Sequence, residues 1–188
     1  MTSEKFFGLL AAARVLPLDG AWGTELACRG LGAGDVPELW NLAHPDKVAE
    51  VPRAYIKAGA RLVLTNTFGG NRIKLDKAGL GDQVRALNEA GARISRKEAG
   101  SVTLVFGSVG PTGEFLAPLG TMSIEEMTQM FEEQIGALVV GGVDGIVVET
   151  MTDLEESLCG LRAAKRVAPH MPVAVSLTFS KGARGFAT

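Results

Sequence analysis

Short apolar runs alternate with longer segments of helical periodicity along this chain of 188 residues. The runs are rich in Val, Ile and Leu and lack polar alternation, a pattern typical of strands that are covered on both faces. Five of them are found, at residues 15–18, 62–65, 102–107, 145–148 and 173–178. Strands that alternate with helices predict βαβ units and a parallel sheet with helices packed outside it.

Apolar residues at spacings of three and four predict helices between these runs. The clearest segments are residues 84–94, 124–138 and 154–167. Ser123 and Glu126 open the second of these with the spacing of a capping box, in which each side chain bonds the backbone amide of the other residue. A further helix over residues 46–58 contains Pro52, and an interior proline costs about 3 kcal/mol. We therefore expect that helix to be kinked or to begin late.

No linker, low-complexity tract or charge run interrupts the chain, so residues 1–188 are predicted to form a single domain. The strand pattern stops after the fifth run. Two architectures satisfy it: a five-stranded open sheet, or the first part of an eight-stranded barrel. Periodicity alone does not choose between them.

Polar residues follow the second and fourth runs in similar surroundings. Asn66 and Thr67 come directly after the second run, and Glu149 with Thr150 comes directly after the fourth. A carboxylate at such a position belongs at the rim of the sheet, because burying an unpaired charge is costly. Polar groups collected at the carboxyl ends of parallel strands are typical of a binding site.

Asp19 occupies the same kind of position, where the first run meets a Gly-rich turn. If Asp19 and Glu149 share one rim, the two carboxylates predict a site for a cationic group such as an ammonium. The structural alternatives are that Asp19 caps the next turn and that Glu149 forms a rim salt bridge. The third run ends at Ser108 in a Gly-rich loop that lacks the lysine of a P-loop, which argues against nucleotide binding.

Composition narrows the function classes further. Apolar residues make up 46% and charged residues 21% of the chain, and the formal net charge of −2 gives no support for nucleic-acid or acidic-membrane binding. No apolar stretch approaches the roughly 18 residues of a membrane span. Two cysteines, Cys28 and Cys159, make no disulfide framework, so a cytoplasmic location is expected. Neither lies at ligand spacing from His44 or His170, so no zinc site is predicted among these four residues.

Four segments in series resemble the homocysteine S-methyltransferase domain family. They are LDGAWGTEL (18–26), TNTFGGNRIKL (65–75), GSVGPTGEFLAPLGTMSIEEM (107–127) and DGIVVETMTDLEE (144–156). The resemblance runs from about residue 15 to the end of the chain. Members include cobalamin-dependent methionine synthase, betaine–homocysteine methyltransferase and enzymes that use S-methylmethionine. The Pro-Thr-Gly-Glu loop favours the cobalamin-dependent or a similar bacterial branch.

The resemblance implies an α/β fold of the (β/α)8 TIM-barrel type, of which this chain holds the first five βα units and is truncated after the fifth strand. It implies that Asp19 and Glu149 hold the amino group of homocysteine or a related thiol amino acid. Asn66, Thr67 and Phe68 would line the substrate pocket, with Ser108 at its mouth. These roles agree with the ammonium site expected from the two carboxylates.

The family binds zinc through three cysteines, one after the sixth strand and a Cys-Cys pair near the end of the barrel. No cysteine of this chain matches them, and Cys28 and Cys159 are not given that role. We therefore expect the chain alone to carry no stoichiometric zinc and to show no methyl transfer. Two hypotheses follow: the homocysteine-binding part of a methyltransferase, or a non-catalytic α/β binding protein derived from the same barrel.

The resemblance also concerns partners. A separate domain or protein would supply the methyl group, and a cobalamin methyl donor is among the candidates. A five-stranded part of a barrel leaves two open sheet edges, which favour self-association.

Overall fold

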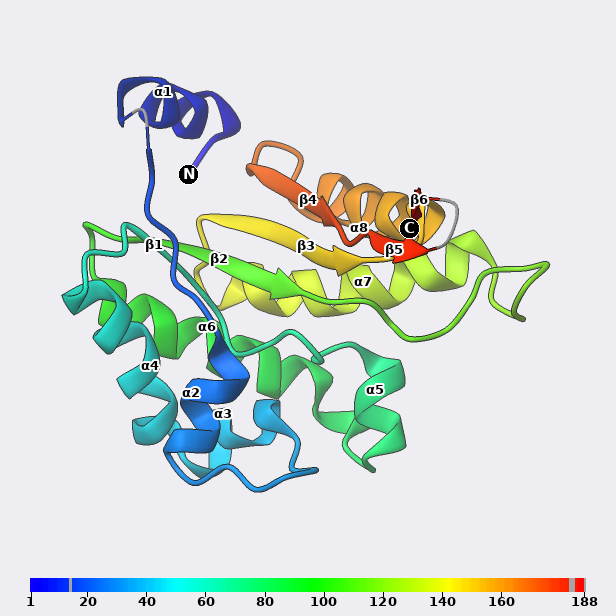
Figure 1. The fold of residues 1–188 in the computed structure, drawn as a ribbon, viewed down its shortest axis with the longest axis horizontal. Coiled ribbons are helices and arrows are strands. Elements are labelled where there is room, and N and C mark those ends of the chain that lie inside the picture. Colours follow the sequence, from blue (N-terminus) through cyan, green and yellow to red (C-terminus); the bar gives the residue numbers. More distant parts are fainter. Residues whose placement is uncertain (14, 183–184, 188) are drawn as a thin grey trace.

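The computed structural model describes residues 1–13, 15–182 and 185–187. Its centre is a sheet of four strands, β1 (Leu62–Leu64), β2 (Leu104–Val109), β3 (Gly145–Met151) and β4 (Val173–Leu177). All neighbours are parallel and lie in chain order, as Figure 1 shows. The predicted α/β fold with a parallel sheet is confirmed.

Residues 15–18, the first predicted strand, lie beside β1 but do not form a regular strand. Leu18 forms an isolated parallel bridge to Leu62, and the amides of Arg61 and Leu62 donate to the Pro17 carbonyl over 2.9 and 3.3 Å. Pro17 has no amide hydrogen to return, so the ladder cannot extend. The prediction of five strands is corrected to four strands and one edge segment.

Helices and 3₁₀ turns connect the strands. They are α1 (Ser3–Ala13), α2 (Trp22–Cys28), η1 (Pro37–Leu39), α3 (Trp40–Ala43), α4 (Pro45–Lys57), α5 (Arg72–Lys77), η2 (Gly81–Gln83), α6 (Val84–Ala99), α7 (Ile124–Val140) and α8 (Leu154–Val167). Ser123 and Glu126 form the predicted capping box at the start of α7. Two short antiparallel strands, β5 (Ser180–Gly182) and β6 (Gly185–Ala187), follow β4 and were not predicted.

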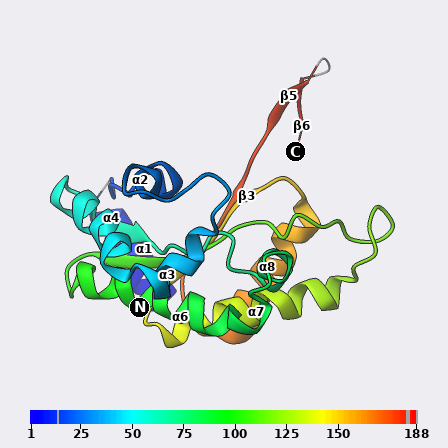
Figure 2. The ribbon, with the colours of Figure 1, turned by 90° about the horizontal axis from the view of Figure 1, so that it is seen from below.

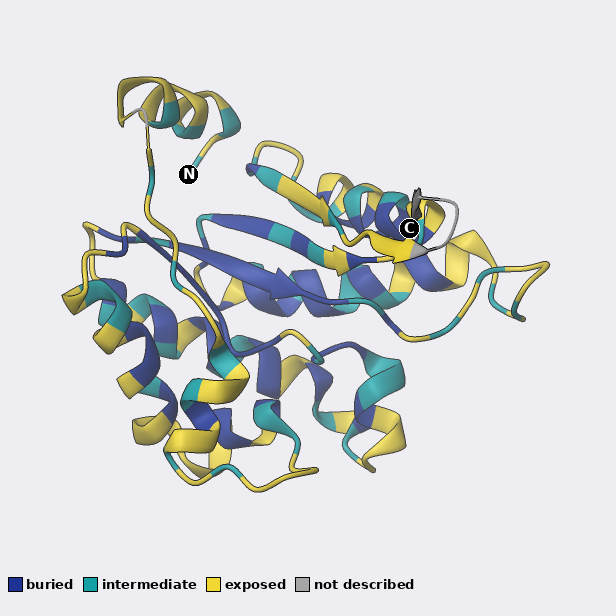
Figure 3. Cartoon of the chain, viewed as in Figure 1, coloured by how far each residue is buried: buried dark blue, intermediate teal, exposed yellow. Residues whose placement is uncertain are grey.

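The long helices cover one face of the sheet. Figure 2 shows α6, α7 and α8 side by side beneath the strands. Alternate strand residues such as Val63, Val105 and Ile146 pack there against Phe131 and Leu138 of α7. Figure 3 shows the result, with buried positions in the sheet and on the sheet-facing sides of the helices. This packing fixes the strand ends, where the polar residues lie.

The opposite face of the sheet carries a smaller apolar cluster. Leu62, Leu64 and Phe106 lie there and contact Phe6 of α1, whose ring centroid is 5.1 Å from that of Phe106. Helix α1 contributes no fully buried residue and was not predicted. None of the described helices is long and apolar enough to cross a membrane.

Of the two outcomes expected for the helix that contains Pro52, a kink or a late start, the late start is not found. Helix α4 begins at Pro45, a proline in the first helical turn, and continues through Pro52 to Lys57. The chain tolerates the interior proline because Val48, Val51 and Pro52 are buried, the two valines in a cluster with Leu26 of α2. Burial of each large apolar side chain is worth about 1.5–3 kcal/mol, which offsets the lost backbone hydrogen bond.

Candidate functional site

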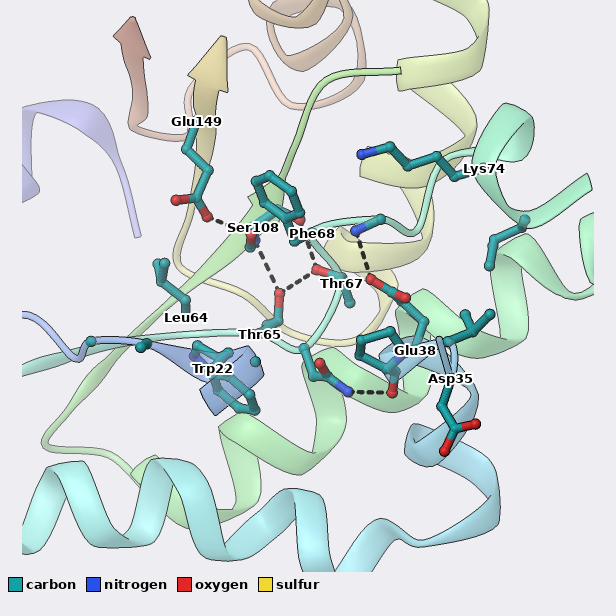
Figure 4. A pocket seen from close by; sticks show the side chains of 18 residues that line it. Trp22, Asp35, Glu38, Leu64, Thr65, Thr67, Phe68, Lys74, Ser108 and Glu149 are labelled. Carbon is teal, nitrogen blue, oxygen red and sulfur yellow. Dashed lines mark hydrogen bonds between the residues drawn. The ribbon is translucent and has the colours of Figure 1, made fainter. Parts of the chain in front are cut away.

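A cavity of about 500 Å³ opens at the carboxyl ends of β1, β2 and β3. Its walls come from the turn before α2, from η1, from the segment between β1 and α5, and from α5 itself. The side chains include Trp22, Glu38, Phe68, Ser108 and Glu149 (Figure 4). The position is the one at which parallel βα folds place their ligands.

Glu149 reaches the cavity because strand β3 is irregular at this point. The register of the β3–β4 pairing shifts between Val148 and Met151, and Thr150 between them has a φ of 60°. A non-glycine residue in the left-handed region costs about 1 kcal/mol or more and is typical of functional sites. The bulge leaves the Glu149 carboxylate within 2.5 Å of the Ser108 hydroxyl, which donates to it. The rim salt bridge considered as an alternative is not found among the described residues.

Asp19 lies beside the cavity, behind its lining residues. One carboxylate oxygen, Oδ2, accepts hydrogen bonds from the Trp22 indole at 2.9 Å and from the Leu64 amide at 2.8 Å. The other oxygen, Oδ1, is buried and has no hydrogen-bond partner among the described residues. Asp19 therefore does not cap α2 through a backbone amide of that helix, and the residue before α2 that serves as N-cap is Ala21. An unpartnered buried oxygen is costly unless a ligand satisfies it.

The negative charge of Glu149 acts on Asp19. Burial raises the pKa of Asp19 from 3.8 to about 6, the hydrogen bonds from Leu64 and Trp22 oppose the rise, and the negative charge of Glu149 adds to it. An ammonium placed between the two groups would reverse both unfavourable effects, because it supplies a counter-charge and hydrogen-bond donors. The cation site expected at this rim stays a prediction.

The side chains of Asn66 and Thr67 form their hydrogen bonds with other residues of the protein. The Asn66 amide donates to the Pro37 carbonyl at 2.7 Å and to Asn41 Oδ1 at 2.9 Å. The Thr67 hydroxyl lies 2.7 Å from the Ser108 carbonyl and 2.6 Å from the Thr65 hydroxyl. Both residues line the cavity, but these bonds make them the floor that holds the ends of β1 and β2 in register.

Phe68 presents its ring at the cavity and is 39% exposed. The ring lies against Gly110, where an added Cβ would come within 2.6 Å of both the ring and the Phe68 carbonyl. The Gly110 amide also donates to that carbonyl at 3.0 Å. Only glycine permits this close approach, so the loop after β2 fixes the position of the aromatic wall.

The same loop is held by a buried acid at the start of α8. Glu156 is 4% exposed and accepts hydrogen bonds from the Thr112 amide and hydroxyl, both at 2.6 Å. Asp153 caps the helix by accepting from the Glu156 amide. The loop that packs against Phe68 is therefore tied to helix α8.

Three charged residues that line the cavity, Asp35, Glu38 and Lys74, were not predicted from the sequence. Glu38 on η1 is buried, accepts from the Gly69 amide at 2.6 Å, and has a pKa raised by burial. Lys74 on α5 lies on the far side of the cavity from Glu149 (Figure 4). Glu38 and Lys74 sit on elements of three and six residues, too short to show a periodic pattern. The only sequence signal was the Lys of TNTFGGNRIKL, a segment singled out for its first residues.

The described residues do not fit a metal ion. Nowhere in that part of the chain do three His, Cys, Asp or Glu side chains converge as ligands. Cys28 is exposed at the end of α2, and Cys159 is buried in α8. Burial raises the pKa of the Cys159 thiol, which disfavours the thiolate that a metal binds.

Comparisons with known proteins agree with this geometry. The sequence model of the family described as homocysteine S-methyltransferase matches residues 16–187. Methionine synthase from Mycobacterium leprae is 34% identical over 183 residues, which cover 89% of this chain and 15% of that protein. Homocysteine S-methyltransferase from Escherichia coli is 30% identical over 169 residues, which cover 79% of this chain and 54% of that protein.

Solved structures of the same kind share the fold. The metallated form of the homocysteine methyltransferase MmuM from Escherichia coli superposes with a TM-score of 0.73 at 28% identity, covering 88% of this chain and 64% of that one. Its oxidised form gives a TM-score of 0.71 and covers 85% of this chain and 60% of that one. The chain thus spans less than two thirds of each of these relatives.

Proposed function

Because the chain belongs to the homocysteine S-methyltransferase family, we propose that it forms the homocysteine-binding part of such an enzyme. In this proposal the acceptor amino acid, homocysteine or a close thiol relative, enters the cavity at the ends of β1, β2 and β3. Its ammonium binds between Asp19 and Glu149. A separate domain or protein supplies the methyl group, with a cobalamin donor among the candidates, and the setting is the cytoplasm.

One observation carries the proposal: Asp19 and Glu149 lie near enough for the charge of Glu149 to raise the pKa of Asp19, and neither has a cationic partner among the described residues. Asp19 has an unpartnered buried oxygen, and Glu149 has only the Ser108 hydroxyl. An ammonium has three donors and one positive charge, which matches these two acceptors. The Ser108 hydroxyl orients Glu149, and the Trp22 indole orients Asp19.

Methyl transfer to sulfur needs a thiolate, because an alkyl thiol with a pKa near 8.5 is mostly protonated at neutral pH. In this family the resemblance assigns that task to a zinc ion held by three cysteines. The described residues do not fit such an ion. The function proposed for this chain is therefore to bind and orient the amino acid, and no chemical step is assigned to its residues.

The test is a binding measurement with Glu149→Gln. Isothermal titration with homocysteine should show a loss of about 1.5 to 3 kcal/mol, roughly ten- to hundredfold, because one charge-assisted hydrogen bond is removed. Glu155→Gln, a change at an exposed acid in the first turn of α8, is the matched control and should bind like the parent. Equal affinities for the parent and Glu149→Gln would remove Glu149 from the site.

A second candidate is a non-catalytic amino-acid-binding protein derived from the same barrel. The two candidates differ when a family segment with the three zinc cysteines is joined after Thr188. The methyltransferase proposal requires bound zinc and methyl transfer to appear together in that fusion. A fusion that binds zinc and homocysteine but transfers no methyl group would favour the second candidate.

A further inference from the structure

Lys74 differs from the other basic residues of helix α5. Arg72 pairs with Glu133 at 2.5 Å, and Lys77 pairs with Glu114 at 2.7 Å. The Lys74 ammonium forms no hydrogen bond or ion pair with any residue in the described part of the chain. It is the one basic side chain of α5 that lines the cavity.

The Lys74 side chain is held in place by its surroundings. Its backbone amide donates to Asn71, the N-cap of α5, at 3.0 Å. Its Nζ atom lies 5.0 Å from the centroid of the Phe68 ring, a cation–π distance. In Figure 4 the ammonium points from α5 back toward Phe68, and Glu149 lies beyond that ring on the other side of the cavity. Lys74 and Glu149 thus bring opposite charges to opposite walls.

This environment leaves the positive charge poorly compensated. Burial lowers the pKa of Lys74, and the more distant carboxylates of Glu38 and Glu156 only partly oppose that effect. Glu38 is not close enough to form an ion pair and has one oxygen bound to the Gly69 amide. A half-buried ammonium without a partner gains from an anionic ligand, because a charge-assisted hydrogen bond replaces lost hydration.

We propose that Lys74 is the carboxylate-binding group of this cavity, so that the cavity recognises ligands with an ammonium at the Asp19–Glu149 wall and a carboxylate at the α5 wall. The part of this inference that places the ammonium of the ligand rests on the proposed function. A carboxylate is the fitting anion because the cavity, at about 500 Å³, is of small-molecule size. Arg72 on the same helix is already paired with Glu133, so it does not add a second positive charge for a phosphate.

The carboxylate can come from either substrate of a methyl transfer. The acceptor amino acid carries one, and so do methyl donors of the betaine and sulfonium amino-acid type. The chemistry at Lys74 is the same in both cases. The two sources are separated by the ligand whose affinity depends on Lys74.

The experiment compares the parent protein, Lys74→Met and Lys77→Met by isothermal titration. Lys77→Met is the matched control, because Lys77 lies on the same helix with an exposed side chain. The probes are homocysteine, 3-aminopropane-1-thiol (the same molecule without its carboxylate), 4-mercaptobutanoate (without its ammonium), glycine betaine and S-methylmethionine. Lys74→Arg retains the charge and should recover much of the affinity.

If Lys74 binds the carboxylate of the acceptor amino acid, Lys74→Met should weaken the binding of homocysteine and 4-mercaptobutanoate about tenfold or more. The binding of 3-aminopropane-1-thiol should not change. If Lys74 instead binds the carboxylate of the methyl donor, the same loss of affinity should appear for glycine betaine or S-methylmethionine alone. The proposal is overturned if Lys74→Met binds every carboxylate probe like the parent, if it weakens 3-aminopropane-1-thiol equally, or if the parent binds none of the carboxylates.

Failure of the proposed function gives a different pattern. Homocysteine that binds equally well to the parent and to Glu149→Gln would contradict the ammonium site. The dependence of 4-mercaptobutanoate on Lys74 would remain as a separate result, because that probe has no ammonium.

Discussion

Replacement of Asp19 by Asn should stabilise the unliganded protein at pH 8 while it weakens binding of an ammonium ligand. Asn is close in size and shape to Asp, and its amide oxygen can still accept hydrogen bonds from the Trp22 indole and the Leu64 amide. It carries no charge into the partly buried position beside Glu149. The site would thus lose a group that favours ligand binding at the expense of stability.

The magnitude follows from the pKa of Asp19, which rises from 3.8 to about 6 in the folded protein. Each pKa unit corresponds to about 1.4 kcal/mol, so the ionised carboxylate costs up to about 3 kcal/mol of folding free energy at pH 8. A raised folded pKa means that the stabilising contribution is complete below about pH 4 and is lost as the pH rises through about 6. The variant should therefore be more stable than the parent by about 1 to 3 kcal/mol at pH 8.

Urea unfolding followed by circular dichroism at pH 4 and pH 8 measures this difference. The parent should lose stability relative to Asp19→Asn between these pH values, and the two proteins should converge at the acidic end. Asp82→Asn, at an exposed aspartate in η2, serves as the control and should show no such gain. The reasoning is refuted if Asp19→Asn is less stable than the parent at pH 8, or if the difference between them does not change with pH.

Three further outcomes are expected. Homocysteine affinity should increase between about pH 5 and pH 7, because Asp19, with a pKa of about 6, must lose its proton to bind an ammonium; titration at several pH values checks this, and a flat profile would count against it. Glu156→Ala should lower the free energy of unfolding by about 1–3 kcal/mol, measured in urea, because it leaves the buried Thr112 donors without an acceptor. Gly110→Ala should displace Phe68 from the cavity wall and weaken every ligand of the cavity, measured by the same titration, and unchanged affinity would mean that the ring is not a wall of the site.

The strand pattern predicted most of the fold because burial on both faces leaves a clear apolar signature. Residues 62–65, 145–148 and 173–178 match β1, β3 and β4 to within a few residues. Residues 15–18 have the same signature, but Pro17 lacks the amide that a ladder requires, and the segment stays an edge. Apolar periodicity indicates which residues are buried, but it does not show that a single hydrogen-bond donor is missing.

The sequence predicted which polar residues lie near the strand ends. It could not show which of them stabilise the fold and which remain open to a ligand. Asn66 follows β1, and Glu149 lies near the carboxyl end of β3. The Asn66 amide finds two partners on neighbouring segments, whereas Glu149 finds one hydroxyl. Whether a polar group braces the fold or remains open to a ligand depends on contacts from η1 and α3, which are distant in the sequence.

The same reasoning explains why Lys74 and Glu38 were missed. Each lies on a short element whose position is set by one local contact: the Asn71 cap for α5, and the Gly69 amide for the Glu38 side chain. Such contacts carry no periodic signal. A cavity between strand ends and short connecting elements therefore has one wall that sequence patterns can predict and one that only tertiary packing creates. In this protein the wall at the strand ends carries Glu149 and the other carries Lys74 beside Glu38, so the opposite charges of Glu149 and Lys74 across the cavity become visible only when both walls are placed together.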